Sequence, residues 1–286
     1  MNGLLVYSKA DYERNKWFAG EILRVAKDKG ICMKLVFTDE DIKTKDIDFA
    51  IIRTISPDTT RYLESSNIRC FNNYETSILC NNKFTTYETI SKLDLPTIPT
   101  TLSSKENLYI TLTEAFEKYN TDELIVKSVS GHGGKEVFLV HNDVPDIESL
   151  LKQCNSLTAH NFFCIQPRIK GIARDLRVYV LGKEIYAARL RTNPSSFKSN
   201  FTLGGTCTPY SPGTDLQRLI KIITDNTDTD FIGIDFILDE NDKFIFNEIE
   251  DVVGTRMLYS TGMDTVVEDY INYIITTVKS HLQANI

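Results

Sequence analysis

Two apolar runs near the C-terminal end of the chain carry acidic side chains within hydrophobic sequence. The first, Phe231–Leu238, reads FIGIDFIL, and the second, Lys243–Glu250, reads KFIFNEIE. The polar stretch Asp239–Asp242 separates them, and two apolar runs joined by a short polar turn are typical of a β-hairpin. Side chains along each strand then alternate between two faces. The hairpin therefore predicts a sheet that buries charge among isoleucine and phenylalanine.

Three acids of this hairpin are expected to share one face. A register that pairs Leu238 with Lys243 places two of them at diagonal positions, with Cα atoms about 7–8 Å apart, and turns Asn247 to the other face. Converging carboxylates in an apolar setting cannot all stay ionised without a positive partner. Their oxygens suit a hard divalent ion such as Mg²⁺, although a solvated hairpin edge that carries acids fits the hairpin alone equally well. The candidate metal ligands are Asp235, Glu248 and Glu250.

The composition is that of an ordinary globular protein. Of the 286 residues, 42% are hydrophobic and 25% are charged, and the formal net charge is −7. A chain of this length accommodates two or three small domains. The negative charge argues against nucleic acid or an anionic membrane surface as the main partner. No apolar stretch approaches the roughly 18 residues that a membrane span needs.

The N-terminus and the cysteines both favour a cytoplasmic protein. Met1–Tyr7 has no basic residue and is expected to be a first strand rather than a secretory signal. The six cysteines form no C-x-x-C pair and the chain has only four histidines, which excludes a zinc site of the usual spacing. We therefore expect reduced thiols that act mostly as small core residues.

A glycine-rich turn, Ser128–Lys135, lies between two strand-like apolar segments. It is not a P-loop, because Val129 stands where the first glycine belongs and Glu136 where Ser or Thr belongs. Nor is it a dinucleotide fingerprint, which needs glycine in place of Glu136. Backbone N–H groups of such a loop can wrap phosphates where glycine permits close approach, and Lys127 precedes it. An ordinary hairpin connection is the alternative.

A second predicted hairpin, Leu176–Arg191, has a Gly-Lys turn and places Arg189 and Arg191 on one face of its second strand. The polar segment Thr192–Gly213 follows it. Loops of this length within a compact domain are usually functional or disordered. Residues 1–80, by contrast, alternate strand-like and helix-like segments and predict a small α/β domain with a parallel sheet.

The order of these features resembles the ATP-grasp superfamily, and most closely its ribosomal protein S6 glutamate ligase-like (RimK-type) branch. The resemblance extends from Asn81 to Tyr259. No single motif in it is specific, but their order is. The matching stretches are Asn82-Lys83, Leu124–Lys127 with the glycine loop, Gln166–Ile169, Arg174–Arg177, Arg191, Lys198–Asn200, Gly204-Gly205, Gly233–Asp235 and Asn247–Glu250.

The resemblance implies an α/β protein with α+β organisation in the grasp region. Residues 1–80 would form an N-terminal α/β pre-ATP-grasp domain. Residues 81–165 would form the central subdomain with the glycine-rich loop, and residues 166–286 the C-terminal subdomain with the magnesium and catalytic residues. The two subdomains would clamp ATP between them. Because many relatives are dimers or tetramers, we also expect a homo-oligomer.

The implied cofactors are ATP and Mg²⁺, with two ions bound and Mn²⁺ able to substitute. Arg191 and Asn200 match residues near the γ-phosphate and the acyl phosphate, and Arg256 is a candidate for holding the substrate carboxylate, with a plain salt bridge as the alternative. His132 in the glycine loop is either a solvated loop residue or a phosphate contact. The implied nucleotide-binding residues are Lys83, Lys127, Ser130, Gly131, His132, Gly133, Gly134, Gln166, Pro167, Arg168, Ile169, Asp175 and Lys198.

The activity that the resemblance implies is that of an ATP-dependent carboxylate–amine ligase. It would form an amide or peptide bond through an acyl phosphate and release ADP and phosphate, acting on small-molecule or peptide carboxylates and amines. Two alternatives stay open: an ATP-grasp phosphotransferase and a nucleotide-binding regulatory protein without catalysis. Three departures from the family pattern stand out: Glu250 in place of the usual Asn, Pro167 in place of a frequent Glu, and Asp251–Arg256 without the usual Ser-Pro-Gly.

Overall fold

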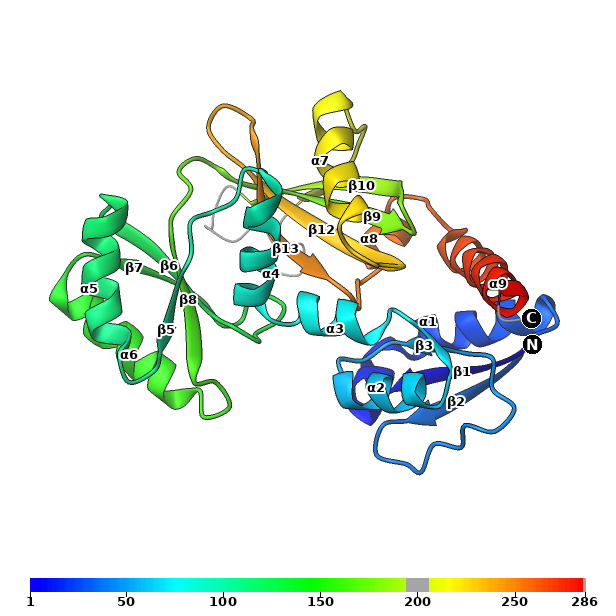
Figure 1. Ribbon diagram of the computed structural model, residues 1–286. Coiled ribbons are helices and arrows are strands. Elements are labelled where there is room, and N and C mark those ends of the chain that lie inside the picture. The colour runs from blue at the N-terminus through cyan, green and yellow to red at the C-terminus, as the bar shows by residue number, and fades with distance from the viewer. Residues whose placement is uncertain (194–205, 285–286) are drawn as a thin grey trace.

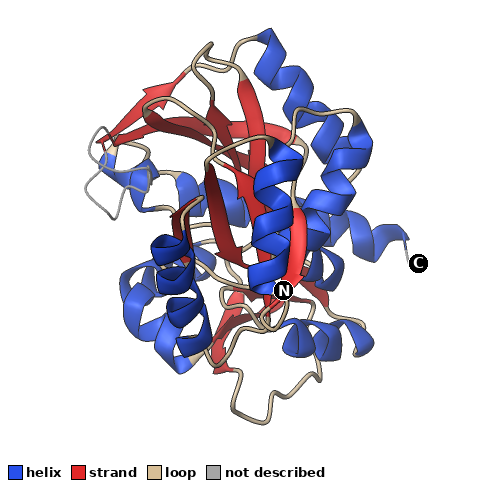
Figure 2. Ribbon diagram, turned by 90° about the vertical axis from the view of Figure 1, so that its left-hand side faces the viewer, coloured by secondary structure: helices blue, strands red, loops and turns tan. Residues whose placement is uncertain are grey.

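The structure, a computed structural model, describes residues 1–193 and 206–284. In this part of the chain the strands form three sheets, and helices flank them (Figures 1 and 2). Mixed helix and sheet is the architecture that the sequence predicts. None of the helices in the described ranges combines the length and the apolar character that a membrane crossing requires.

The N-terminal unit is a parallel sheet in the strand order β2-β1-β3-β4. β1 is buried over Leu4–Tyr7, as expected for an apolar strand covered on both faces. The chain leaves β1 toward β2 on one side and reaches β3 on the other, so the carboxyl ends of β1 and β3 form a topological switch point. The elements are β1 (Asn2–Tyr7), α1 (Lys9–Asp28), β2 (Cys32–Phe37), β3 (Phe49–Ile52), α2 (Pro57–Ser65) and β4 (Arg69–Phe71).

A helical linker leads to the central unit, which has an antiparallel sheet in the order β5-β8-β6-β7. Helices α5 and α6 pack on one face through a hydrophobic cluster that includes Leu112, Leu150 and Phe163. The other face is left for the functional site. The linker and unit comprise α3 (Tyr74–Cys80), α4 (Lys83–Ile90), the 3₁₀ turn η1 (Ser91–Leu93), β5 (Thr101–Ser104), α5 (Leu108–Tyr119), β6 (Glu123–Ser128), β7 (Val137–His141), α6 (Val144–Ser156) and β8 (Phe162–Pro167).

The C-terminal unit has an antiparallel sheet in the order β11-β10-β9-β12-β13. Alternation along its strands sends apolar residues such as Leu176 and Ile234 to a core beneath α7, and sends charged residues to the opposite face. The elements are β9 (Ala173–Leu181), β10 (Glu184–Asn193), β11 (Thr206–Tyr210), α7 (Thr214–Asp225), β12 (Phe231–Leu238), β13 (Phe244–Glu250), α8 (Arg256–Ser260) and α9 (Val266–Ala284).

The last helix, α9, packs against α1 of the N-terminal unit, so the beginning and end of the chain share a core (Figure 1). That core includes Leu5 and Ile22 from the first sheet and helix, Phe231 from β12, and Tyr270 from α9. The N-terminal sheet is therefore seated on the C-terminal unit. The central unit lies at the opposite end of the molecule from the N-terminal unit (Figure 1).

Candidate functional site

A cavity lies between the central sheet and the charged face of the C-terminal sheet. Its lining comes from α4, from the glycine-rich loop between β6 and β7, and from β8, β9, β10, β12 and β13. The segments that the resemblance had singled out along the chain therefore meet in one place. The predicted site residues in its lining are Lys83, Lys127, Gly131, His132, Gly133, Gly134, Gln166, Pro167, Arg168, Ile169, Asp175, Arg191, Asp235 and Glu248.

The three hairpin acids converge, as strand alternation predicted, although the predicted register is wrong. Carboxylate oxygens of Asp235, Glu248 and Glu250 lie within 4.8 Å of one another. Asp235 is paired directly with Glu248 rather than with Phe246, because Leu238 pairs with Phe244 at the turn and an irregularity after Asp235 shifts the β12–β13 ladder by one further residue. A bulge of this kind re-aims the side chains beyond it. It brings the two acids closer than the diagonal arrangement would.

The same irregularity overturns the predicted orientation of Asn247. Its side chain lines the cavity, and its Oδ1 accepts a hydrogen bond of 2.8 Å from Lys127 Nζ. Burial lowers the pKa of Lys127, and the nearby carboxylate of Glu248 opposes this. This hydrogen bond connects the central sheet to the C-terminal sheet within the lining of the cavity.

Arg177 holds two of the three acids in place. Its Nε and Nη2 donate to the two oxygens of Asp235 at 2.8 and 2.7 Å, and Nη2 also lies 2.7 Å from Glu250 Oε1. The neighbouring Gly233 makes room for Val253, since a Cβ at Gly233 would approach Val253 Cγ2 to 2.7 Å, whereas its distance of 3.5 Å from Arg177 Cδ would be ordinary contact. Sequence reasoning did not name Arg177 as a site residue. Its position two residues after Asp175, on the same face of a strand, was the available signal.

Arg191 links the acids of two strands. Its Nε donates to Asp175 Oδ1 at 2.6 Å, and its Nη2 contacts both the second oxygen of Asp175 and Asp235 Oδ2, the latter at 2.7 Å. All three side chains are buried. Burial raises the pKa of Asp235, but Arg177 and Arg191 outweigh it and lower the value to about 2. Asp235 is therefore an anion at any physiological pH.

The donor set fits a hard divalent cation. A carboxylate offers roughly four acceptor positions, and the two arginines use three of those on Asp235. Glu248 is more open, since the ion pair recorded for it is a 3.7 Å contact with Lys83. Three ionisable carboxylates beside a phosphate-sized space are the ligands that Mg²⁺ and Mn²⁺ prefer.

Lys83 and the glycine-rich loop form the opposite wall. Lys83 is the first residue of α4, and its Nζ contacts the carbonyl oxygen of Gly131. Gly133 and Gly134 have φ of +68° and +72°, the left-handed region that side chains disfavour. Ser130 is exposed on the same loop and pairs with His160. His132 lines the cavity, and its partial burial there, together with the positive charge of Lys83, lowers its pKa.

The end of β8 supplies the remaining edge of the cavity. Gln166 Nε2 donates to Thr100 Oγ1 at 2.8 Å, which fixes the side chain against the start of β5. Arg168 pairs with Glu123 at 2.7 Å, so its side chain is anchored to β6. Pro167, between these two residues, has no N–H group, so its backbone can offer a ligand only the carbonyl oxygen.

A family model for the RimK-like ATP-grasp domain matches residues 80–274 of this chain. The chain belongs to the RimK-like ATP-grasp family. This confirms the family that the sequence resembles, and with it the ATP-grasp fold and the class of ATP-grasp ligases.

Curated relatives span most of the chain. It is 27% identical to the uncharacterized protein MG011 of Mycoplasma genitalium over 288 residues, which cover 98% of this chain and 94% of that protein. It is 25% identical to the glutamate–LysW ligase ArgX of Sulfolobus acidocaldarius over 79% of this chain and 81% of that protein.

Solved structures share the fold of this RimK-like protein. The D-alanine–D-alanine ligase from Bacillus anthracis complexed with ATP superposes with a TM-score of 0.77 at 14% identity, covering 99% of both chains. The RimK domain ATP-grasp protein from Sphaerobacter thermophilus gives a TM-score of 0.70 at 14% identity, covering 96% of this chain and all of that one.

Arg256 lies away from the cavity of this RimK-like domain. It begins α8, is exposed, and donates to the carbonyl of Arg14 in the N-terminal unit at 3.1 Å. A different arginine, Arg53, follows β3 at the switch point and donates to the carbonyl of Val253 at 2.9 Å. Its Nε and the Oη of Tyr7 are buried without a hydrogen-bond partner in the described part of the chain. Lys198 and Asn200 lie outside the described residues.

Proposed function

We propose that this protein is an ATP-dependent carboxylate–amine ligase that works through an acyl phosphate. The observation that carries the proposal is the cavity in which Lys83, Lys127 and the glycine-rich loop face Arg191, Asp235 and Glu248, with a carboxylate oxygen of Glu250 within 4.8 Å of these two acids. One wall is suited to phosphates and the other to the cation that accompanies them. Family membership supports ATP as the nucleotide.

In this proposal the protein contributes position and charge rather than a nucleophile. A substrate carboxylate oxygen attacks the γ-phosphorus, ADP leaves, and an amine nitrogen then forms the amide bond as phosphate departs. Lys83, Lys127 and the N–H groups of the loop would hold the phosphates. Arg191, fixed by Asp175 and Asp235, would face the negative charge that develops at the transferred group.

Asp235, Glu248 and Glu250 would hold Mg²⁺, or Mn²⁺ in its place, with two ions accommodated. When bound, the ion would neutralise phosphate charge. Because Glu250 is paired with Arg177, the added negative charge that distinguishes it from the usual Asn is already balanced within the protein. This supports Glu250 as a tolerated third ligand.

The carboxylate and amine substrates are proposed to be amino acids or peptides. The chemistry named for the relatives, joining glutamate to the protein LysW in ArgX, is of this class. A second observation supports this substrate class: at the switch point of the N-terminal sheet, Arg53 Nε and Tyr7 Oη are buried without a hydrogen-bond partner among the residues that the structure describes. Ligands of open α/β sheets bind at such points.

The decisive experiment measures ADP and inorganic phosphate together across a panel of amino acids and dipeptides. A ligase produces both, in equal amounts, only when a carboxylate and an amine are present. A phosphotransferase would produce ADP without free phosphate, and a regulatory binding protein would produce neither. Lys127→Ala should abolish turnover, whereas Lys152→Ala on the exposed surface of α6 should not; equal activity of both variants would refute the site.

A further inference from the structure

The glycine-rich loop is held in shape by side chains as well as by its backbone. At its base, Lys83 N–H donates to the carbonyl of Val129 at 3.0 Å, and Val129 N–H donates to the carbonyl of Phe162 at 3.1 Å. Ser128 N–H also donates to the carbonyl of Glu136 at 3.1 Å, and Gly131 N–H to the carbonyl of Ser128 at 3.4 Å, so side chains add to these backbone contacts between Ser130 and Glu136. Gly133 and Gly134 lie in that stretch, and a glycine-containing segment is costly to order.

Glu136 folds back across the loop. Its Oε2 contacts the hydroxyl of Ser128, and a side chain at Gly131 would collide with both groups. The carboxylate therefore fills the space that a larger residue at Gly131 would need. Glu136 is also part of the cavity lining, so its position bears on the space available to a phosphate.

His160 bridges the two ends of this stretch. It comes from the turn between α6 and β8, and its ring lies with Nε2 3.2 Å from Glu136 Oε1 and Nδ1 3.1 Å from Ser130 Oγ. One neutral tautomer satisfies both contacts, since Nε2–H donates to the carboxylate while Nδ1 accepts from the hydroxyl. The side chains of His160 and Glu136 are only 16% and 25% exposed.

We propose that His160 is a positioning residue for nucleotide binding: with Glu136 and Ser130 it closes the glycine-rich loop into the shape that receives the phosphates. His160 is not among the residues that line the cavity, so it acts through its two partners. The inference rests on the proposed function, because it takes ATP phosphates as the ligand of the loop. A loop ordered in advance binds more tightly because less entropy is lost on binding.

The test compares two probes, the non-hydrolysable ATP analogue AMP-PNP with MgCl₂ and adenosine, which has no phosphates. By calorimetry, His160→Ala should weaken AMP-PNP binding roughly 10-fold, the usual scale for hydrogen bonds to a charged group. Adenosine binding should stay as in the wild type, because adenosine carries no phosphate for the loop to hold. A general loss of structure would weaken both probes.

Two further variants complete the design. His160→Gln, whose amide can still reach Glu136, should recover part of the AMP-PNP affinity. His141→Ala is the matched control, since it removes another histidine–carboxylate pair of the same unit, with Asp146 at 2.7 Å, and His141 is not among the residues that line the cavity. Unchanged AMP-PNP affinity in His160→Ala, or an equal loss in His141→Ala, would overturn the inference. If Lys127→Ala also left AMP-PNP binding unchanged, the proposed function itself would fail.

Discussion

Each acid on the charged face of the C-terminal sheet has a cationic partner from a different element. Transferring an ion from water into the protein interior costs several kcal/mol, so acids in this environment need a cationic partner. The same pairs orient the carboxylates toward the cavity. The pairs are Asp175 with Arg191, Asp235 with Arg177 and Arg191, Glu250 with Arg177, and Glu248 with Lys83.

Among these cationic partners, Arg177 is the one whose removal should lower the free energy of unfolding most. Arg177→Met leaves Asp235 and Glu250 without their shared counter-charge, so we expect the free energy of unfolding in urea to fall by about 3–5 kcal/mol. The control is Lys9→Met, which removes an exposed pair with Asp39 and should leave the free energy of unfolding nearly unchanged. Similar values for the two variants would contradict the role given to Arg177.

For single residues, the sequence predicted which acids share a face of the sheet better than it predicted which residues each side chain contacts. Period-two alternation was enough to bring Asp235, Glu248 and Glu250 to one face. It could not show the bulge after Asp235, which sets the register and turns Asn247 into the cavity. Nor could it show that Arg256 lies against the N-terminal unit, since that contact joins residues far apart in the chain.

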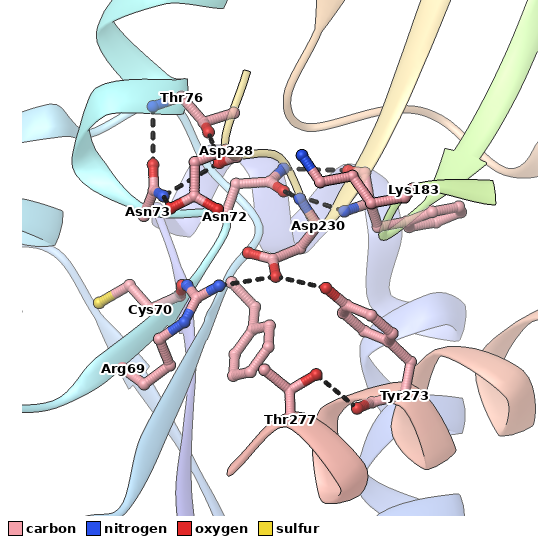
Figure 3. Close-up of polar contacts among 12 residues, drawn as sticks. Arg69, Cys70, Asn72, Asn73, Thr76, Lys183, Asp228, Asp230, Tyr273 and Thr277 are labelled. Atoms are coloured by element: carbon pink, nitrogen blue, oxygen red, sulfur yellow. Dashed lines mark hydrogen bonds and ion pairs between the residues drawn. The ribbon is translucent and has the colours of Figure 1, made fainter. Parts of the chain in front are cut away.

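Among the elements, the junction between β4 and β12 shows how the N-terminal sheet is attached (Figure 3). Asn72 follows β4, and its amide donates to the carbonyls of Phe231 and Asp251 at 2.9 and 2.7 Å while its oxygen accepts from the N–H groups of Asp230 and Phe231, both at 2.9 Å. Beside it, Asp230 Oδ1 accepts from Arg69 at 2.7 Å and from Tyr273 at 2.8 Å. The side chain of Asn72 thus satisfies four backbone polar groups of the C-terminal unit.

Asp230 should make stability depend on pH. Burial raises its pKa to about 6, and Arg69 and Tyr273 oppose this without cancelling it. A carboxyl whose pKa is higher in the folded than in the unfolded state stabilises the fold when protonated, and this stabilisation is lost as pH rises from about 4 to about 6. Between pH 5 and pH 7 the wild type should therefore lose about 1 kcal/mol more than Asp230→Asn in urea unfolding.

The difference between the pH profiles of the wild type and Asp230→Asn isolates the titration of Asp230, because other buried acids, such as Asp251, titrate in both proteins. Parallel pH profiles for wild type and Asp230→Asn would show that Asp230 does not titrate in this range. Far-UV circular dichroism at each pH would establish that both proteins remain folded at the start of the titration.

For the whole molecule, the sequence predicted the classes of structure better than their assembly. Apolar runs joined by short turns predicted the two hairpins, whose strands are neighbours in the chain, and the alternation of strand-like and helix-like segments predicted the parallel N-terminal sheet. The division at residues 80 and 165 stays a prediction. The packing of α9 against α1 was not predicted, since an amphipathic helix shows which face it buries but not against which partner.

The cavity is the feature that depends on the assembly of two units. It needs the central sheet to place Lys127 and the glycine-rich loop opposite Arg191 and the acids of the C-terminal sheet. The central claim is that a phosphoryl group passes from ATP to a substrate carboxylate within this cavity before the amide bond forms.

That claim is tested most directly with a substrate whose carboxylate is labelled with ¹⁸O, once the panel has identified one. If an acyl phosphate forms, one labelled oxygen leaves with the phosphoryl group, and mass spectrometry will find ¹⁸O in the inorganic phosphate in proportion to the amide produced. Inorganic phosphate that carries no label while amide accumulates would contradict the mechanism.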